Sequence, residues 1–202
     1  MTVFQLLMLG ASAFFAYKIY EHIQTLKDPE NIEQEDENTV PKRTAEAFST
    51  FDSSSLIDKG DEAMSEGKLD KALAIYSEAN IKAPHDSETV FKMGYALAKQ
   101  DRNDEALEYY KEALELDKQN PFIHQAMASL YRKDKEYASA RMHLNASLSL
   151  DTENKITYYN YGNLLVDMKS FDEARDMYNK AIELDANFKE AKEELQKLQE
   201  DI

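Results

Sequence analysis

The chain has 202 residues, 43% of them hydrophobic, which suffices for one domain of ordinary size with an appendage. Its net charge of -15 disfavours a broad electrostatic surface for nucleic-acid phosphates or anionic membranes. The absence of cysteine excludes disulfide frameworks, thiolate metal sites and thiol nucleophiles, and the scarcity of glycine and proline predicts an all-α protein.

An uncharged apolar segment opens the chain, from Thr2 to Tyr17. If its helix continues past Lys18, the span reaches about 18 residues, within the roughly 17–25 that a bilayer requires. The sequence therefore predicts a transmembrane anchor helix with a short juxtamembrane extension over residues 1–27. A cleaved signal peptide is the alternative, because Ala11-Ser12-Ala13 has the small-x-small form of a cleavage site, although no basic residue precedes the apolar run.

Basic residues flank the predicted anchor only on its C-terminal side, at Lys18, Lys27, Lys42 and Arg43. The positive-inside rule therefore favours a cytoplasmic location for the rest of the chain, with an extracytoplasmic location as the alternative. Ser12 and Ala16 form a small-x-x-x-small pair, which is compatible with weak self-association of the anchor.

An acidic segment follows, which we predict to be a disordered linker over residues 28–52. Six acidic residues and no basic residue lie between Asp28 and Val40. Such a composition offers little apolar surface to bury and favours a solvated spacer.

A pattern of small, small, aromatic and small residues then recurs at intervals of 34 residues. Its first three positions are Gly60, Ala72 and Tyr76; Gly94, Ala106 and Tyr110; Ala128, Ala140 and Leu144; and Gly162, Ala174 and Tyr178. This period and pattern resemble the tetratricopeptide repeat (TPR). The resemblance implies a right-handed all-α solenoid of four helix-turn-helix repeats and a capping helix, at residues 53–86, 87–120, 121–154, 155–188 and 189–202.

Each position of the pattern has an expected packing role. The small residues are expected where the two helices of a repeat cross, because larger side chains would force the helices apart. The aromatic residue is expected to fill the space between one helix pair and the next. The third repeat departs from the pattern, with Ala128 in place of glycine and Leu144 in place of the aromatic residue.

The family resemblance also implies that the first helix of each repeat lines a concave groove for a partner. The candidate groove residues are Phe91, Tyr95, Lys99, Phe122, Gln125, Arg132, Lys133, Tyr159 and Asn163. We expect the aromatic residues to anchor a peptide, the amides to bond its backbone, and the three cations to meet an acidic group. Ile57 and Asp61 occupy positions where a chaperone-tail carboxylate clamp would need lysine and asparagine, so that ligand is disfavoured.

The chain resembles small single-span, membrane-anchored TPR proteins of bacteria. We therefore expect a membrane-tethered adaptor that binds a protein or peptide. The alternatives are an extracytoplasmic assembly or chaperone-like factor for envelope or secreted proteins, and a regulatory subunit of a membrane enzyme complex. We expect no catalysis, cofactor, metal or nucleic-acid binding, because the four histidines are scattered and no glycine-rich phosphate loop occurs.

Overall fold

The computed structural model describes residues 50–200, and over this range it confirms the all-α solenoid and contains no strand. The helices are α3 (Ser53–Ser65), α4 (Leu69–Lys82), α5 (Ser87–Lys99), α6 (Asn103–Leu116), α7 (Pro121–Lys133), α8 (Tyr137–Leu150), α9 (Lys155–Asp167), α10 (Phe171–Leu184) and α11 (Lys189–Glu200). The predicted anchor and nearly all of the predicted linker lie outside the described residues. Within that described range, no helix is long and apolar enough to span a bilayer.

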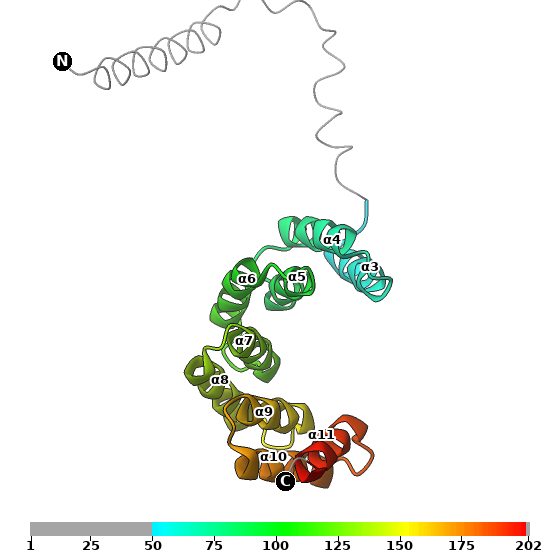
Figure 1. Cartoon of the computed structure of the whole chain (residues 1–202). Helices are drawn as coiled ribbons and strands as arrows, with labels where there is room; N and C mark the ends of the chain where they lie inside the picture. Colours follow the sequence, from blue (N-terminus) through cyan, green and yellow to red (C-terminus); the bar gives the residue numbers. More distant parts are fainter. Residues whose placement is uncertain (1–49, 201–202) are drawn as a thin grey trace, which may run out of the picture. The chain divides into compact units, whose positions relative to one another are not determined.

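The helices pack as successive antiparallel pairs that follow an arc (Figure 1). In this arc α3, α5, α7 and α9 lie on the inner side, and α4, α6, α8 and α10 lie on the outer side (Figure 1). Neighbouring first helices also contact one another directly: α5 contacts α7, and α7 contacts α9. The inner, concave surface is therefore built from the first helices, which is where the family resemblance places a groove.

A capping residue fixes the start of each first helix. Asp52, Asp86, Asn120 and Asn154 are 34 residues apart, and the side chain of each accepts a hydrogen bond from a backbone N–H in the first turn. These bonds satisfy donors that a helix start leaves without a partner. The start of every first helix is thus specified locally, in register with the repeat.

Three repeats place the ring of a tyrosine directly on a glycine of the same repeat. A Cβ atom added at Gly60 would lie 2.2 Å from Cε1 of Tyr76, and one at Gly94 would lie 2.8 Å from Cδ1 of Tyr110. Gly162 and Tyr178 repeat this arrangement, with a closest approach of 2.4 Å. The glycine is therefore required by the tyrosine ring that covers it.

This packing adds a second role to the one expected of the aromatic residue. The sequence predicts that the ring fills the space between helix pairs, whereas the ring lies first of all within its own repeat. It also reaches the next pair, since Tyr76 packs with Met93 and Ala96 of α5. One tyrosine thus closes its own helix pair and joins that pair to the following one.

The third repeat fills the same position with different side chains. Ala128 and Leu144 are both buried there and pack together with Ala140 and Leu164. Leucine lacks the flat ring that approaches Gly94 so closely, and the space it leaves accommodates the alanine methyl group. The two departures noted in the sequence therefore compensate for each other.

The last helix, α11, covers the exposed end of the solenoid. Phe188 and Ala191 pack with Ala181 of α10, and Leu198 packs with Leu165 and Tyr178. The rest of α11 is largely charged and exposed. A capping helix with one apolar face is what a stack of repeats needs at its terminus.

Candidate functional site

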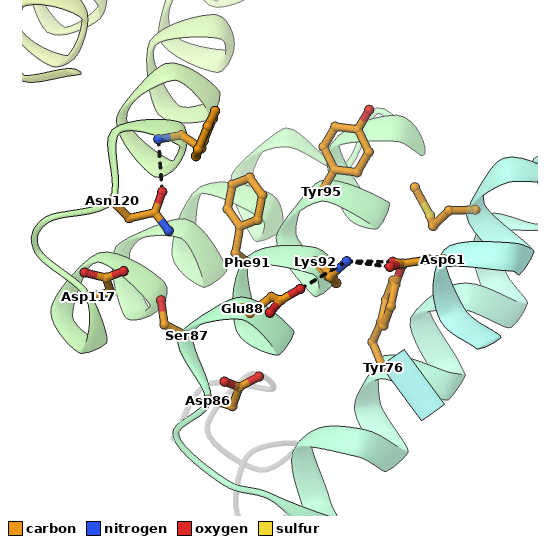
Figure 2. Close-up of a pocket in the computed structure, with 12 residues that line it drawn as sticks. Asp61, Tyr76, Asp86, Ser87, Glu88, Phe91, Lys92, Tyr95, Asp117 and Asn120 are labelled. Carbon is orange, nitrogen blue, oxygen red and sulfur yellow. Dashed lines mark hydrogen bonds and ion pairs between the residues drawn. The ribbon is translucent and has the colours of Figure 1, made fainter. Parts of the chain in front are cut away.

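A hollow of about 700 Å³ opens on the concave surface between α3, α5 and the start of α7. Figure 2 shows its lining, with Phe91 projecting between Asn120 and Tyr95. The lining residues are Asp61, Met64, Tyr76, Asp86, Ser87, Glu88, Phe91, Lys92, Tyr95, Asp117, Asn120 and Phe122. The site therefore spans the first and second repeats and the first turn of the third.

Three of the predicted groove aromatics meet in this hollow. Phe91 and Tyr95 lie one turn apart on α5, and Phe122 comes from the first turn of α7. The Phe91 ring rests on Tyr110, with ring centroids 5.4 Å apart. Tyr95 is 42% exposed and Phe122 is 57% exposed. Tyr95 and Phe122 are thus presented to solvent on a concave surface, and Phe91 in the same hollow is supported by the buried Tyr110.

A polar cluster closes the α3 side of the hollow. Lys92 Nζ donates to both carboxylate oxygens of Asp61, at 2.8 and 2.7 Å, and the Tyr76 hydroxyl donates to the same carboxylate at 2.6 Å. Burial works to lower the pKa of Lys92, but the hydrogen bond and charge of Asp61, together with Glu88, outweigh it and raise that pKa. Burial and the Asp61 bond also raise the pKa of Tyr76. Lys92 therefore stays charged and is compensated internally.

The rest of the rim is acidic. Asp86 accepts hydrogen bonds from Thr89, and Asp117 accepts one from the backbone N–H of Gln119. No lysine or arginine among residues 50–200 pairs with either carboxylate. Glu88 is 65% exposed and lies 3.4 Å from Lys92. The lining thus holds four carboxylates and one already paired ammonium group.

The predicted amide contacts turn out to be internal. Gln125 is buried and donates to Thr157 Oγ1 at 2.7 Å, and Thr157 is also within 3.1 Å of the Ser147 hydroxyl. Asn163 accepts a hydrogen bond from the Tyr178 hydroxyl at 2.7 Å. Both side chains therefore bond within the solenoid, and neither lines the hollow.

Tyr159 also has a packing role. Its ring lies between Tyr178 and Phe188, with centroid distances of 6.0 and 5.3 Å. It joins the fourth repeat to the capping helix. The structure thus separates Tyr159 from Phe91, Tyr95 and Phe122.

The predicted basic cluster lies outside the hollow and is largely paired. Lys133 Nζ is 2.6 Å from Asp101, and Arg132 Nε is 3.6 Å from Asp167. Lys99 Nζ lies 5.2 Å from the centroid of the Tyr95 ring. These cations sit toward the C-terminal ends of α5 and α7, whereas Phe122 and Glu88 sit at the N-terminal ends.

Sequence reasoning missed Ser87 and Lys92 of α5. It also missed Asp86, Asp117 and Asn120, which lie in the turns between repeats, outside the first helices that the family resemblance singles out. A signal was present, because Asp86 and Asn120 share one 34-residue register, and Asp117 shares another with Asp151 and Asp185. No metal site is indicated, since residues 50–200 contain no suitable group of three histidine or acidic side chains.

Two family models described as tetratricopeptide repeat match the chain, at residues 63–130 and 157–188. The matched stretches lie in the solenoid, whose fold is that of tetratricopeptide repeats. These matches agree with the 34-residue period, the paired helices and the concave surface. A comparison with curated protein sequences finds no match.

Solved structures share the TPR fold. The first TPR domain of human RPAP3 is 28% identical, with 58% of this chain and 93% of that chain covered and a TM-score of 0.56. The first TPR of Spaghetti (RPAP3), bound to the HSP90 peptide SRMEEVD, is 27% identical over 56% of this chain and 90% of that one, with a TM-score of 0.54. A MamA crystal structure is 24% identical over 70% of this chain and 82% of that chain, with a TM-score of 0.61.

Proposed function

We propose that the chain is a membrane-tethered adaptor that holds a segment of a partner protein in the hollow between α3, α5 and α7. The observation that carries this proposal is the group of aromatic side chains there, with Tyr95 and Phe122 exposed beside Phe91. The first TPR of Spaghetti (RPAP3), which shares this fold, is bound to a peptide, so the role we propose for this surface is recognition.

Physical chemistry favours occupation of this surface. Covering a phenylalanine side chain removes apolar area from water and contributes roughly 1.5–3 kcal/mol for full burial. Phe122 is mounted on the first turn of α7, which is capped by Asn120 and held by Pro121 at the first helical position. Anchors on rigid helices lose little conformational freedom when a partner binds. The three rings can therefore serve as preorganised contacts for an extended or helical segment.

The test is site-specific photocrosslinking of the full chain in its native membrane or cell. A photoreactive residue replaces Phe122 on the concave surface, and a matched control replaces Met142, which is 60% exposed on the outer helix α8. We expect one defined partner to be captured at position 122 and not at position 142. Equal capture at the two positions, or capture at 142 alone, would refute the groove.

The tether in this proposal is the apolar segment from Thr2 to Tyr17. Deletion of residues 2–17 should release the protein from membranes, while the full chain should resist extraction with alkaline carbonate. Protease treatment of intact and opened cells then assigns the TPR domain to one side, and we propose the cytoplasmic side from the basic residues that follow the segment. Release of the full chain by carbonate would contradict the proposed tether. It would not bear on the proposal that the hollow binds a partner.

A further inference from the structure

We infer that the segment held in the hollow is cationic, with lysine or arginine side chains between apolar or aromatic residues. This inference rests on the proposed function, because it names the chemistry of the partner at that same site. It reverses the expectation from sequence that the groove meets an acidic group.

The lining of the hollow carries an excess of negative charge. Asp61, Asp86, Glu88 and Asp117 contribute carboxylates, and Lys92 is the one cation in the lining. Lys92 is held by Asp61 at 2.7 Å and by Glu88 at 3.4 Å, so its charge is compensated before any ligand arrives. Asp86 and Asp117 have no such compensation in residues 50–200. A concave surface of one sign concentrates ligands of the opposite sign.

Two aromatic rings of the hollow are free to receive a cation from a ligand. The chain places its own cations on several aromatic rings, since Lys59 lies 3.0 Å from the Phe51 centroid and Lys155 lies 5.2 Å from that of Phe188. Among the rings of the hollow, Tyr95 has Lys99 at 5.2 Å from its centroid. In the described part of the chain, Phe91 and Phe122 carry no such cation, although both line an acidic hollow. Lysine and arginine are attracted to the faces of aromatic rings at such sites. A hollow that contains both aromatic rings and carboxylates suits a cationic side chain better than a hollow with only one of these groups.

The charge of the lining disfavours an acidic ligand. An acidic peptide in this hollow would place its carboxylates beside Glu88 and Asp117, and like charges brought together are unfavourable. The candidate cations Lys133 and Arg132 lie outside the lining and pair with Asp101 and Asp167. The Spaghetti (RPAP3) domain, by contrast, is bound to a peptide, SRMEEVD, in which three of the last four residues are acidic.

The experiment selects ligands from a displayed library of random peptides on the immobilised full chain. Enriched peptides are then synthesised, and their affinities are measured by fluorescence anisotropy at low and high salt. We expect enriched sequences to combine lysine or arginine with aromatic or large apolar residues, and their binding to weaken as salt rises.

Two double variants with the same change in net charge give the decisive comparison. Glu88→Gln with Asp117→Asn removes two rim charges, and asparagine keeps the oxygen that accepts the Gln119 N–H bond. Glu112→Gln with Glu115→Gln removes two exposed charges of α6 outside the hollow. The rim variant should bind an enriched peptide about five- to tenfold more weakly, and the α6 variant less than about twofold.

Each outcome separates the inference from the proposed function. Acidic or neutral enriched peptides that lose affinity on Phe122→Ala would overturn the cationic inference and support the groove. Equal weakening by both double variants would also overturn it, because the attraction would then come from the net charge of the whole protein. Enriched peptides that are indifferent to Phe122→Ala would refute the groove and the inference together.

Discussion

The second repeat, α5 and α6, and the third repeat, α7 and α8, share one backbone plan and fill it with different chemistry. In the second repeat Tyr110 covers Gly94 and carries Phe91 on its ring. In the third repeat the positions 34 residues later hold Leu144, Ala128 and Gln125. An aromatic stack in one repeat is thus replaced by smaller side chains and a hydrogen-bonded amide in the next.

A second pair of positions shows the same contrast. Val90 and Tyr109 of the second repeat correspond to His124 and His143 of the third. The two histidines face each other with their Nδ1 atoms 2.9 Å apart, and His143 also stacks on Tyr131 at a centroid distance of 5.3 Å. Burial, and next the proximity of His124, lower the pKa of His143 to about 4. One ring must donate and the other accept, so at least one of the two rings is neutral when this bond forms.

The contrast explains why the hollow lies where it does. A stack of rings leaves Phe91 at the surface of the second repeat, where it meets Tyr95 and Phe122. The corresponding Gln125 is buried and donates to Thr157, whose hydroxyl in turn lies 3.1 Å from that of Ser147, so Gln125 does not line the hollow. The second repeat therefore presents Phe91 and Tyr95 in the hollow, whereas the third repeat presents Phe122 there and uses Gln125 to bond to the fourth repeat.

The largest effect should come from removing the ring of the second repeat. Tyr110→Ala deletes a buried side chain that supports Phe91 and covers Gly94, and we expect a loss of about 3–5 kcal/mol in the free energy of unfolding. Urea unfolding followed by circular dichroism measures it. Leu144→Ala, the matched change in the third repeat, should cost less because less volume is removed, and a larger cost there would contradict the contrast.

The histidine pair should make the third repeat sensitive to acid. The folded pKa of His143, about 4, lies below the usual value of about 6.5, so the unfolded chain binds more protons between these values. Stability should therefore fall as pH decreases from about 6.5 to about 4, by about 3 kcal/mol from this residue.

The double variant His124→Val with His143→Tyr installs the residues of the second repeat. The free energy of unfolding of this variant, measured with urea at several pH values, should no longer show the decrease that we assign to His143. The pH dependence that comes from the carboxylates should be unchanged. Parallel curves for the variant and the natural protein would show that the histidines do not contribute.

A smaller effect should follow from adding one methyl group to the second repeat. Gly94→Ala places a Cβ 2.8 Å from the Tyr110 ring, which we expect to cost about 1–3 kcal/mol in unfolding free energy. Combined with Tyr110→Leu, which reproduces the third repeat, the same alanine should cost much less. A double-mutant cycle measures the coupling, and strictly additive losses would contradict the proposed compensation.

Much of the fold follows from the sequence because its causes are local and periodic. The 34-residue register places Gly60, Gly94 and Gly162 at helix crossings, and the capping residues recur with the same spacing. Helix pairs are therefore specified repeat by repeat. The compensation between Ala128 and Leu144 could also be anticipated, since both depart from the pattern in one repeat.

The residues of the candidate site were harder to predict from the sequence. The register assigns Gln125 and Asn163 to the groove-facing helices, but their partners, Thr157 and Tyr178, are found only once the chain is folded. Lys133 and Arg132 likewise pair with Asp101 and Asp167, and the sequence register does not predict these ion pairs. Periodicity predicts which helix a residue occupies, and packing decides which residues remain for a ligand.

The central claim, that the hollow between α3, α5 and α7 binds a partner, is tested most directly by a matched pair of alanine variants. Phe122 and Ile156 occupy the same position of successive repeats, are 57% and 40% exposed, and only Phe122 lines the hollow. Both Phe122→Ala and Ile156→Ala should leave the free energy of unfolding within about 0.5 kcal/mol.

The measurement is the affinity of each variant for a peptide selected on the full chain. Phe122→Ala should weaken binding about tenfold or more, as expected for an aromatic anchor, and Ile156→Ala less than about twofold. Equal losses, or a larger loss for Ile156→Ala, would contradict the account.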